Sequence, residues 1–168
     1  MDKTFSGKVW KLPDDVDTDS IIAVRYCIIV KKAEMAKHCL ESLRPDFTAN
    51  VKPGDIIVGG KNFGCGSSRE QAAEALKESG IACIIAKSFA RIFFRNAINN
   101  GMLLIESDVI PDQVAEDDVI TVNVSQSVVV NGQKYPISKL PDYLMDIIND
   151  GGLVQNTIKR MQALEGGE

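Results

Sequence analysis

The first half of the chain alternates short apolar runs with segments of helical period. Residues 55–59 and 81–86 are mostly branched or small apolar residues, as in strands buried on both faces. Segments 67–80 and 88–99 follow them with one apolar and one polar face, and the second stops at Gly101, a natural left-handed helix end. This order of strand and helix predicts an α/β fold.

Serines stand where both of these helical segments begin. Ser67 and Glu70 have the S-x-x-E spacing of a capping box. Ser88 could cap the next helix in the same way. A further amphipathic pattern covers residues 33–43 and stops before a proline. We therefore expect helices that begin at Ser67 and Ser88, and a continuous helix over 33–43.

The C-terminal half has the alternation of an antiparallel sheet. Residues 119–124 and 127–130 read as strands, and Asn131-Gly132 is the type I′ turn signal of a hairpin into 133–137. A first strand is expected at 8–12. Two helices, one after Pro141 and one over 153–164, are expected to close the chain before a frayed end at 165–168. The sequence thus predicts a single-domain α/β fold with a mixed sheet.

Composition narrows the class of protein. A chain of 168 residues, 45% hydrophobic and 25% charged, suffices for one compact domain, taken here as residues 1–168. Its 19 basic and 23 acidic residues include no dense basic block, which argues against nucleic acid as a partner. No apolar run approaches the roughly 20 residues that cross a bilayer. Residues 1–7 lack the layout of a signal peptide, so we expect a cytoplasmic protein.

Metal ligands are sparse in this sequence. The four cysteines are widely spaced, without a C-x-x-C pair: Cys27, Cys39, Cys65 and Cys83. We expect free thiols, no metal site and no cofactor in this chain. The only histidine, His38, has the position of a packing or surface residue on the 33–43 helix. The acidic run 14–19 lacks the glycine and terminal glutamate of a calcium loop and reads as a polar turn.

The segment Gly64-Cys65-Gly66-Ser67-Ser68-Arg69-Glu70 carries the strongest chemical signal. Its glycines let the backbone approach a ligand, amides at a helix start attract an anion, and an arginine can bind a carboxylate through two parallel hydrogen bonds. In that field the Ser67 hydroxyl could lose its proton and then remove a proton from carbon. A capped helix without a catalytic role is the alternative that spacing alone leaves open.

The same segment argues against nucleotide binding. Arg69 stands where the third glycine of a G-x-G-x-x-G fingerprint would be, and the Gly-Lys-Ser/Thr end of a P-loop is missing. A module that only holds a carboxylate or phosphate ligand, without catalysis, is the rival that fits these residues better.

Three stretches in this order closely resemble the swivelling domain of the aconitase superfamily: 17–22 (DTDSII), 62–72 (NFGCGSSREQA) and 87–101 (KSFARIFFRNAINNG). Over nearly all of residues 7–165, the length and layout resemble the stand-alone small subunits of isopropylmalate dehydratase and homoaconitase. The resemblance implies a swivelling β/β/α domain that is active only with a separate large subunit. It also implies that the large subunit holds a [4Fe-4S] cluster whose open iron acts as a Lewis acid.

The resemblance also implies roles for residues of this chain. Ser67 would take and return the carbon-bound proton, Arg69 would bind a substrate carboxylate, and Ser68 and Gly66 would shape the same anion pocket. The implied reaction is a hydro-lyase interconversion of 2-isopropylmalate and 3-isopropylmalate through isopropylmaleate, in leucine biosynthesis. The implied assembly is a heterodimer or heterotetramer.

Substrate choice in this family is attributed to a loop that matches residues 25–30 here. In homoaconitase-like relatives, the position that matches Ile28 looks like an arginine, which suits an extra carboxylate on the substrate. The apolar side chains of Ile28 and Ile29 suggest instead a pocket for an isopropyl group. Burying that group gains roughly 0.8 kcal/mol per carbon, whereas an unpaired carboxylate there would cost several kcal/mol. Dimethylmalate, citramalate and homocitrate remain alternatives, the last if Arg25 faces the pocket. Residues 28–30 could also be core residues of a strand.

Overall fold

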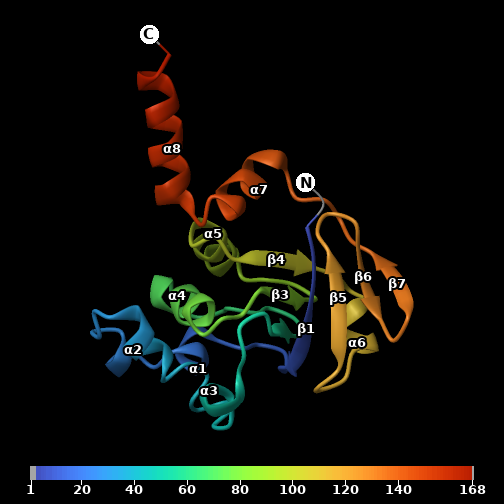
Figure 1. Ribbon diagram of the computed structural model, residues 1–168. Helices are drawn as coiled ribbons and strands as arrows, with labels where there is room; N and C mark the ends of the chain where they lie inside the picture. Colours follow the sequence, from blue (N-terminus) through green and yellow to red (C-terminus); the bar gives the residue numbers. More distant parts are fainter. Residues whose placement is uncertain (1–2, 168) are drawn as a thin grey trace.

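The computed structural model describes residues 3–167, in which seven strands form one mixed sheet (Figure 1). Its spatial order is β4-β3-β2-β1-β5-β6-β7. Strands β1 to β4 are parallel and β5 to β7 join antiparallel, which confirms the predicted mixed α/β fold. The strands are β1 (Thr4–Lys11), β2 (Ile56–Val58), β3 (Cys83–Ala86), β4 (Leu103–Glu106), β5 (Val119–Asn123), β6 (Ser127–Val130) and β7 (Gln133–Pro136).

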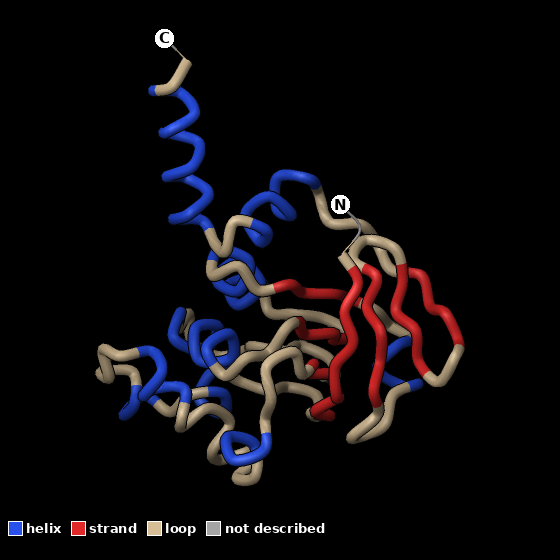
Figure 2. Tube along the Cα trace, in the orientation of Figure 1, coloured by secondary structure: helices blue, strands red, loops and turns tan. Residues whose placement is uncertain are grey.

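Strand β1 joins the two halves of the sheet. Its C-terminal residues pair with β2 in parallel, beginning with Val9 opposite Ile56. Its N-terminal residues pair with β5 in the antiparallel sense, with Phe5 opposite Val122. Figure 2 shows the antiparallel strands turned across the direction of the parallel ones. The sheet therefore curls at β1.

The helices lie mainly on one side of the parallel strands (Figure 1). They are α1 (Thr18–Ile21), α2 (Lys32–Ala36), α3 (Phe47–Asn50), α4 (Glu70–Glu78), α5 (Arg91–Asn99), α6 (Ile110–Gln113), α7 (Asp142–Asn149) and α8 (Leu153–Glu165), with a 3-10 turn at Val24–Tyr26. No helix within residues 3–167 is long and apolar enough to cross a membrane.

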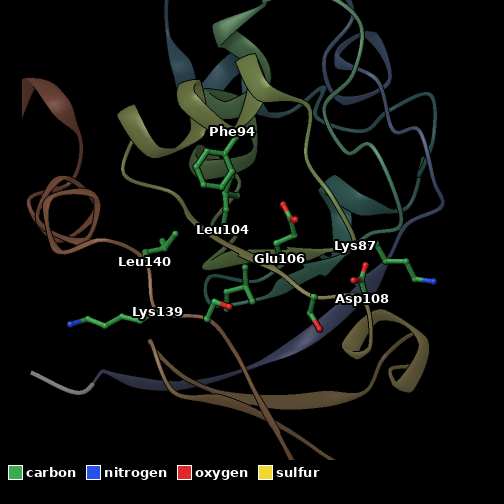
Figure 3. Close-up of a pocket in the computed structure, with 10 residues that line it drawn as sticks. Lys87, Phe94, Leu104, Glu106, Asp108, Lys139 and Leu140 are labelled. Atoms are coloured by element: carbon green, nitrogen blue, oxygen red, sulfur yellow. The ribbon is translucent and has the colours of Figure 1, made fainter.

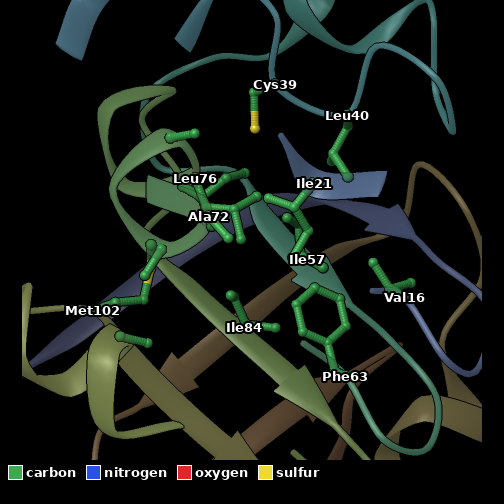
Figure 4. Packing of buried hydrophobic residues seen from close by; sticks show 14 of the residues in the cluster. Val16, Ile21, Cys39, Leu40, Ile57, Phe63, Ala72, Leu76, Ile84 and Met102 are labelled. Atoms are coloured by element: carbon green, nitrogen blue, oxygen red, sulfur yellow. The ribbon is translucent and has the colours of Figure 1, made fainter. Parts of the chain in front are cut away.

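Two apolar cores lie on opposite faces of the parallel strands. In the first core, Ile57 and Ile84 of the sheet face α1, α2, α4 and α5. They pack with helix residues such as Ile21 of α1 and Leu76 of α4 (Figure 4). Alternate strand residues, such as Ile85, meet the inner faces of β5 and β6 in the second core. Because both faces are covered, these strands carry continuous apolar runs rather than alternation.

The continuous helix expected over 33–43 is wrong. Helix α2 ends at Ala36, and turns follow it. Leu40 has a φ of +55° and is fully buried, and its N–H donates to the carbonyl of Ile21 at 2.7 Å. A tertiary hydrogen bond and the burial of one leucine thus outweigh the helical pattern of the segment.

The closing elements follow the sequence prediction. Asn131 and Gly132 have φ values of +49° and +80°, as a type I′ hairpin requires. Helix α7 begins after Pro141, and α8 projects from the body of the domain (Figure 1). Helix α8 ends at Glu165, and residue 168, part of the segment expected to fray, lies outside the described residues.

Candidate functional site

Loops that follow β1, β2 and β3 meet at the carboxyl edge of the parallel strands. The central loop, residues 59–69, is bonded on one side to the first loop through Gly64 N–H and the carbonyl of Val16, at 2.7 Å. On its other side, Phe63 N–H donates to the carbonyl of Ser88 at 3.0 Å. The carboxyl edge of parallel strands is the usual place for ligands in such sheets. The three sequence stretches that carry the family resemblance come together here.

Gly64 is essential to the close packing of the central loop. Its φ is +83°, and a Cβ at this position would lie 2.1 Å from Cγ of Phe93 in α5. Gly66, also at positive φ (+96°), is exposed beside it. The loop therefore passes directly over α5 and returns to the start of α4.

The predicted capping box at Ser67 is wrong. Helix α4 begins at Glu70 with Arg69 as the N-cap residue, and no side chain caps it. Ser67 instead contacts a residue 49 positions earlier: its Oγ lies 2.9 Å from Thr18 Oγ1, and its N–H donates to the same oxygen at 3.2 Å. Ser67 is exposed, so its hydroxyl is open to the outside of the loop.

The predicted cap at Ser88 is also wrong. Helix α5 begins at Arg91, and its N-cap residue Ala90 makes no side-chain cap bond. The Ser88 hydroxyl accepts a hydrogen bond from Asn62 N–H at 2.8 Å. Both serines thus tie neighbouring loops together rather than satisfying amides of their own helices.

Arg69 is held with one edge of its guanidinium free. Its Nη1 contacts the carboxylate of Asp19 and also donates to the carbonyl of Ile22 at 3.1 Å. These two bonds use both protons on Nη1 and leave the Nε and Nη2 protons as a parallel pair of donors. The side chain is 17% exposed. This free edge has the geometry for bidentate binding of a carboxylate.

Ser68 completes the exposed turn between Gly66 and Arg69. Its side chain is exposed, and its carbonyl accepts a hydrogen bond from Nδ2 of Asn96 in α5 at 3.2 Å. Asn96 lies in the third family stretch, although the motif predicted no role for it. The four predicted residues from 66 to 69 therefore lie on one short turn, which hydrogen bonds to α1 and α5 hold in place.

The loop 25–30 does not form a strand, so the alternative that Ile28 and Val30 are core residues is wrong. Ile28 is 84% exposed and Val30 is 92% exposed. Ile29 is half-buried and packs on the main core, so it points away from the exposed side. Cys27 precedes these residues in the loop. Burial raises the pKa of its thiol and the charge of Arg69 opposes that rise, which places the loop near Arg69.

Arg25 is engaged at the far side of this loop. Its guanidinium lies over the Tyr26 ring at 4.7 Å and pairs with Glu41 at 3.8 Å. Together with Asp19 and His38, Arg25 lines a hollow of about 230 Å³. His38 is stacked on Tyr26 with ring centroids 3.7 Å apart, a packing role in agreement with the sequence.

A second hollow lies at the same edge of the sheet, beyond β4 (Figure 3). It has a volume of about 350 Å³ and is lined by Lys87, Glu106, Asp108 and Lys139 with apolar residues that include Phe94 and Leu104. Lys87 and Lys139 are paired with Asp112 and Asp142. None of the predicted site residues lines this hollow.

All four cysteines are free thiols, as expected. Cys39 and Cys83 are fully buried; burial raises the pKa of Cys39 to about 12 and also raises that of Cys83. Burial also raises the pKa of Cys65, and the negative charges of Asp17 and Asp15 raise this pKa further. Within residues 3–167, no three or more His, Cys, Asp or Glu side chains are grouped to hold a metal ion.

Comparison with known proteins gives a consistent set of relatives. The Aconitase C-terminal domain family matches residues 44–109. The 3-isopropylmalate dehydratase small subunit of Lachnospira eligens is 55% identical over 166 residues, which cover 99% of both chains. The isopropylmalate/citramalate isomerase small subunit of Methanocaldococcus jannaschii is 48% identical, over 96% of this chain and 98% of that one.

A solved structure resembles the whole fold. The crystal structure of 3-isopropylmalate dehydratase from Methanocaldococcus jannaschii superposes with a TM-score of 0.93 at 38% identity, and the match covers 99% of this chain and 100% of that one. The fold and the full length of the chain are thus shared with these relatives.

Proposed function

Because the chain belongs to the family of 3-isopropylmalate dehydratase small subunits, we propose that it supplies the proton-transferring half of this hydro-lyase. The enzyme interconverts 2-isopropylmalate and 3-isopropylmalate by dehydration and rehydration through isopropylmaleate, in leucine biosynthesis. The single observation that carries our assignment of the site is the exposed turn 66–69, which presents the Ser67 hydroxyl and the free edge of Arg69 only two residues apart in the chain.

Arg69 orients the substrate in this proposal. The Nε and Nη2 protons bind one carboxylate of the hydroxy-dicarboxylic acid, while Asp19 and the carbonyl of Ile22 keep the guanidinium from turning. Ser68 and the backbone at Gly66 border the same carboxylate. The substrate is thereby held with its reacting carbon over the exposed turn.

Ser67 moves the proton. Its oxygen, as the alkoxide, removes the carbon-bound proton during dehydration, and the same hydroxyl returns a proton when water adds back. The positive charge of Arg69 two residues away favours the anionic form. Because the proton stays on one exchangeable oxygen, the chain serves both directions of the isomerisation.

A [4Fe-4S] cluster does not fit the cysteines of this chain. Cys39 and Cys83 are buried with raised pKa values, whereas cluster ligands are thiolates, and the four thiols do not gather at one place. We therefore place the cluster in the large partner subunit, where it would supply the Lewis acid for the departing hydroxyl. The two subunits would assemble as a heterodimer or heterotetramer in the cytoplasm.

Ile28 supports isopropylmalate as the substrate. An 84% exposed isoleucine, on a loop that lies near Arg69, is available to be covered when substrate and partner bind. Its contact with an isopropyl group gains roughly 0.8 kcal/mol per buried carbon. Ile29 does not share this role, since it packs on the core.

Citramalate is the leading alternative substrate. The related small subunit from Methanocaldococcus jannaschii carries both isopropylmalate and citramalate in its name. Dimethylmalate also presents a short branched group to Ile28. Homocitrate is disfavoured because Arg25, the residue that could hold its extra carboxylate, is already paired with Glu41.

We expect the Ile28→Arg variant to shift substrate preference by at least about tenfold from isopropylmalate toward homocitrate. A guanidinium can bind the extra carboxylate of homocitrate, whereas it makes an unfavourable contact with an isopropyl group. The ratio of kcat/KM for the two substrates measures this shift. The matched control is Val154→Arg, since Val154 is 66% exposed on the distant helix α8 and should leave the ratio unchanged. An unchanged ratio in Ile28→Arg contradicts the specificity proposal.

The test of the function is ultraviolet absorbance of the alkene during turnover. The chain is mixed anaerobically with its cluster-loaded large subunit and offered isopropylmalate, citramalate, dimethylmalate or homocitrate in turn. We expect turnover only in the mixture and fastest with isopropylmalate. Another preferred substrate would keep the chemistry and change the pathway, whereas no turnover with any of them would favour a non-catalytic carboxylate-binding module.

A further inference from the structure

Thr18 is the residue that the structure places directly behind Ser67. It is 2% exposed, at the first position of α1. Its backbone is fixed on three sides: its N–H donates to the carbonyl of Cys65 at 2.9 Å, its carbonyl accepts from Ile22 N–H at 3.0 Å, and the Asp17 carboxylate caps α1 by accepting from Ser20 N–H at 2.6 Å. These bonds hold the backbone of Thr18, and so the starting point of its side chain, in a fixed position.

Both observed hydrogen-bond contacts of the Thr18 hydroxyl are with Ser67. Thr18 Oγ1 accepts from Ser67 N–H at 3.2 Å and lies 2.9 Å from Ser67 Oγ. A hydroxyl has one proton and two lone pairs. With one lone pair used by the amide, its proton remains free to be donated along the 2.9 Å contact.

The direction of that contact depends on the protonation of Ser67. In the neutral state either oxygen can donate. When Ser67 has lost its proton, only Thr18 can donate, and the bond becomes charge-assisted and stronger. A hydrogen bond that strengthens with ionisation lowers the pKa of the group that ionises. Because Thr18 is buried, its hydroxyl needs no reorganisation when the charge appears.

We infer that Thr18 is a positioning residue for the reaction, which aims Ser67 Oγ outward and donates a hydrogen bond to its alkoxide. The inference rests on the proposed function, because it assigns Thr18 a role through Ser67 as the base. The charged and titratable groups around this pair are Asp17, Asp19, Arg69 and Cys65. All four stay in place when only the Thr18 hydroxyl is changed.

The test compares Thr18→Val, which keeps the shape and removes the hydroxyl, with Thr18→Ser, which keeps the hydroxyl. Each variant is assembled with the cluster-loaded large subunit, and kcat and KM for isopropylmalate are measured across pH. We expect Thr18→Val to lose about 100-fold in kcat, the size of effect seen when one donor to a developing oxyanion is removed, with KM changed by less than about threefold. The acid limb of its kcat profile should move to higher pH, because Ser67 then ionises less readily.

The serine variant should restore kcat to within about threefold of the parent and return the acid limb to its original position, since it can still donate. Equal losses in both variants, with an unmoved acid limb, would show that Thr18 only supports the fold and would overturn the inference. Thermal melting and co-elution with the large subunit check that each variant is folded and assembled. If Thr18→Val fails that check, Thr18→Ala, which cannot clash, is expected to show the same loss and the same pH shift.

A further variant distinguishes the role of Thr18 from the role of Ser67 as the base. Ser67→Ala is measured in the same assembled enzyme. If Ser67→Ala retains full turnover, the base assignment itself is wrong. If Ser67→Ala is inactive while Thr18→Val keeps normal kcat and the parent pH profile, Ser67 remains the base and only the role of Thr18 is lost.

Discussion

The Ser67→Ala variant is expected to fold and assemble normally while its kcat falls by about 10²- to 10⁴-fold, the usual range for loss of a positioned proton-transfer group. The Ser67 side chain is exposed and makes one side-chain contact, with Thr18 Oγ1. Removing one such hydrogen bond costs about 1 kcal/mol of folding free energy. Turnover is measured by alkene absorbance in the assembled enzyme, and stability by thermal melting of the isolated chain.

The matched control for this variant is Ser79→Ala. Ser79 lies beyond the opposite end of α4, and its hydroxyl donates to the carbonyl of Ala75 at 2.7 Å and also lies beside the buried thiol of Cys39. It should lose comparable stability and keep its turnover. Near-normal kcat in Ser67→Ala would refute the base assignment, even if substrate binding had weakened.

The Gly64→Ala variant is expected to lose about 2 to 5 kcal/mol of folding free energy. A φ of +83° costs an alanine about 1–2 kcal/mol, and its Cβ would overlap the Phe93 ring at 2.1 Å, which adds overpacking of about 1–3 kcal/mol. For a chain of this length, the melting temperature should fall by roughly 4 to 20 °C. Because Gly64 packs on Phe93 and closely precedes the turn 66–69 in the same loop, turnover should fall as well, even at temperatures where the variant remains folded.

Gly132→Ala separates the two components of this loss. Gly132 has a φ of +80°, and a Cβ there would meet nothing within 4 Å. It therefore measures the backbone strain alone, about 1–2 kcal/mol, in the exposed β6–β7 hairpin. Equal destabilisation of the two variants in thermal or chemical denaturation would mean that the Phe93 contact contributes nothing to the packing of the site loop.

Local patterns predicted the elements whose stability is local. The Asn131-Gly132 turn is specified by two residues that accept positive φ, and it has the expected conformation. Strands β2 and β3 were recognisable from apolar runs because both faces of each are covered. These features depend little on which distant residue packs beside them.

The errors arose where a distant partner replaced a local one. Ser67 has the spacing of a capping box, but it bonds Thr18 at the start of α1 instead. Ser88 bonds Asn62, and Leu40 leaves the helical conformation to bond Ile21. Local residue spacing contains no information about a contact between residues 49 positions apart, so periodicity could not predict the bond between Thr18 and Ser67.

The candidate site was partly accessible from sequence. The residues from 66 to 69 were identified through the glycine-rich motif and its family resemblance, and they lie together as one exposed turn. Thr18, Asp19 and Asn96 were missed as individual contributors. The signal was present in the order of the three family stretches, since short motifs separated by strands of one parallel sheet tend to meet at its carboxyl edge.

The double pairing of β1 has a consequence for how the chain folds during synthesis. Its parallel partner begins at Ile56, but its antiparallel partner β5 begins only at Val119. At ordinary elongation rates, the ribosome needs about 5 to 20 s to make the stretch between β1 and β5. During that interval, the edge of β1 that later pairs with β5 has free backbone N–H and C=O groups. The apolar face of the parallel strands that β5 and β6 later cover is exposed. The nascent chain therefore has its greatest exposure to chaperones and to misassociation after the parallel layer has formed and before the hairpin β5–β6 closes over it.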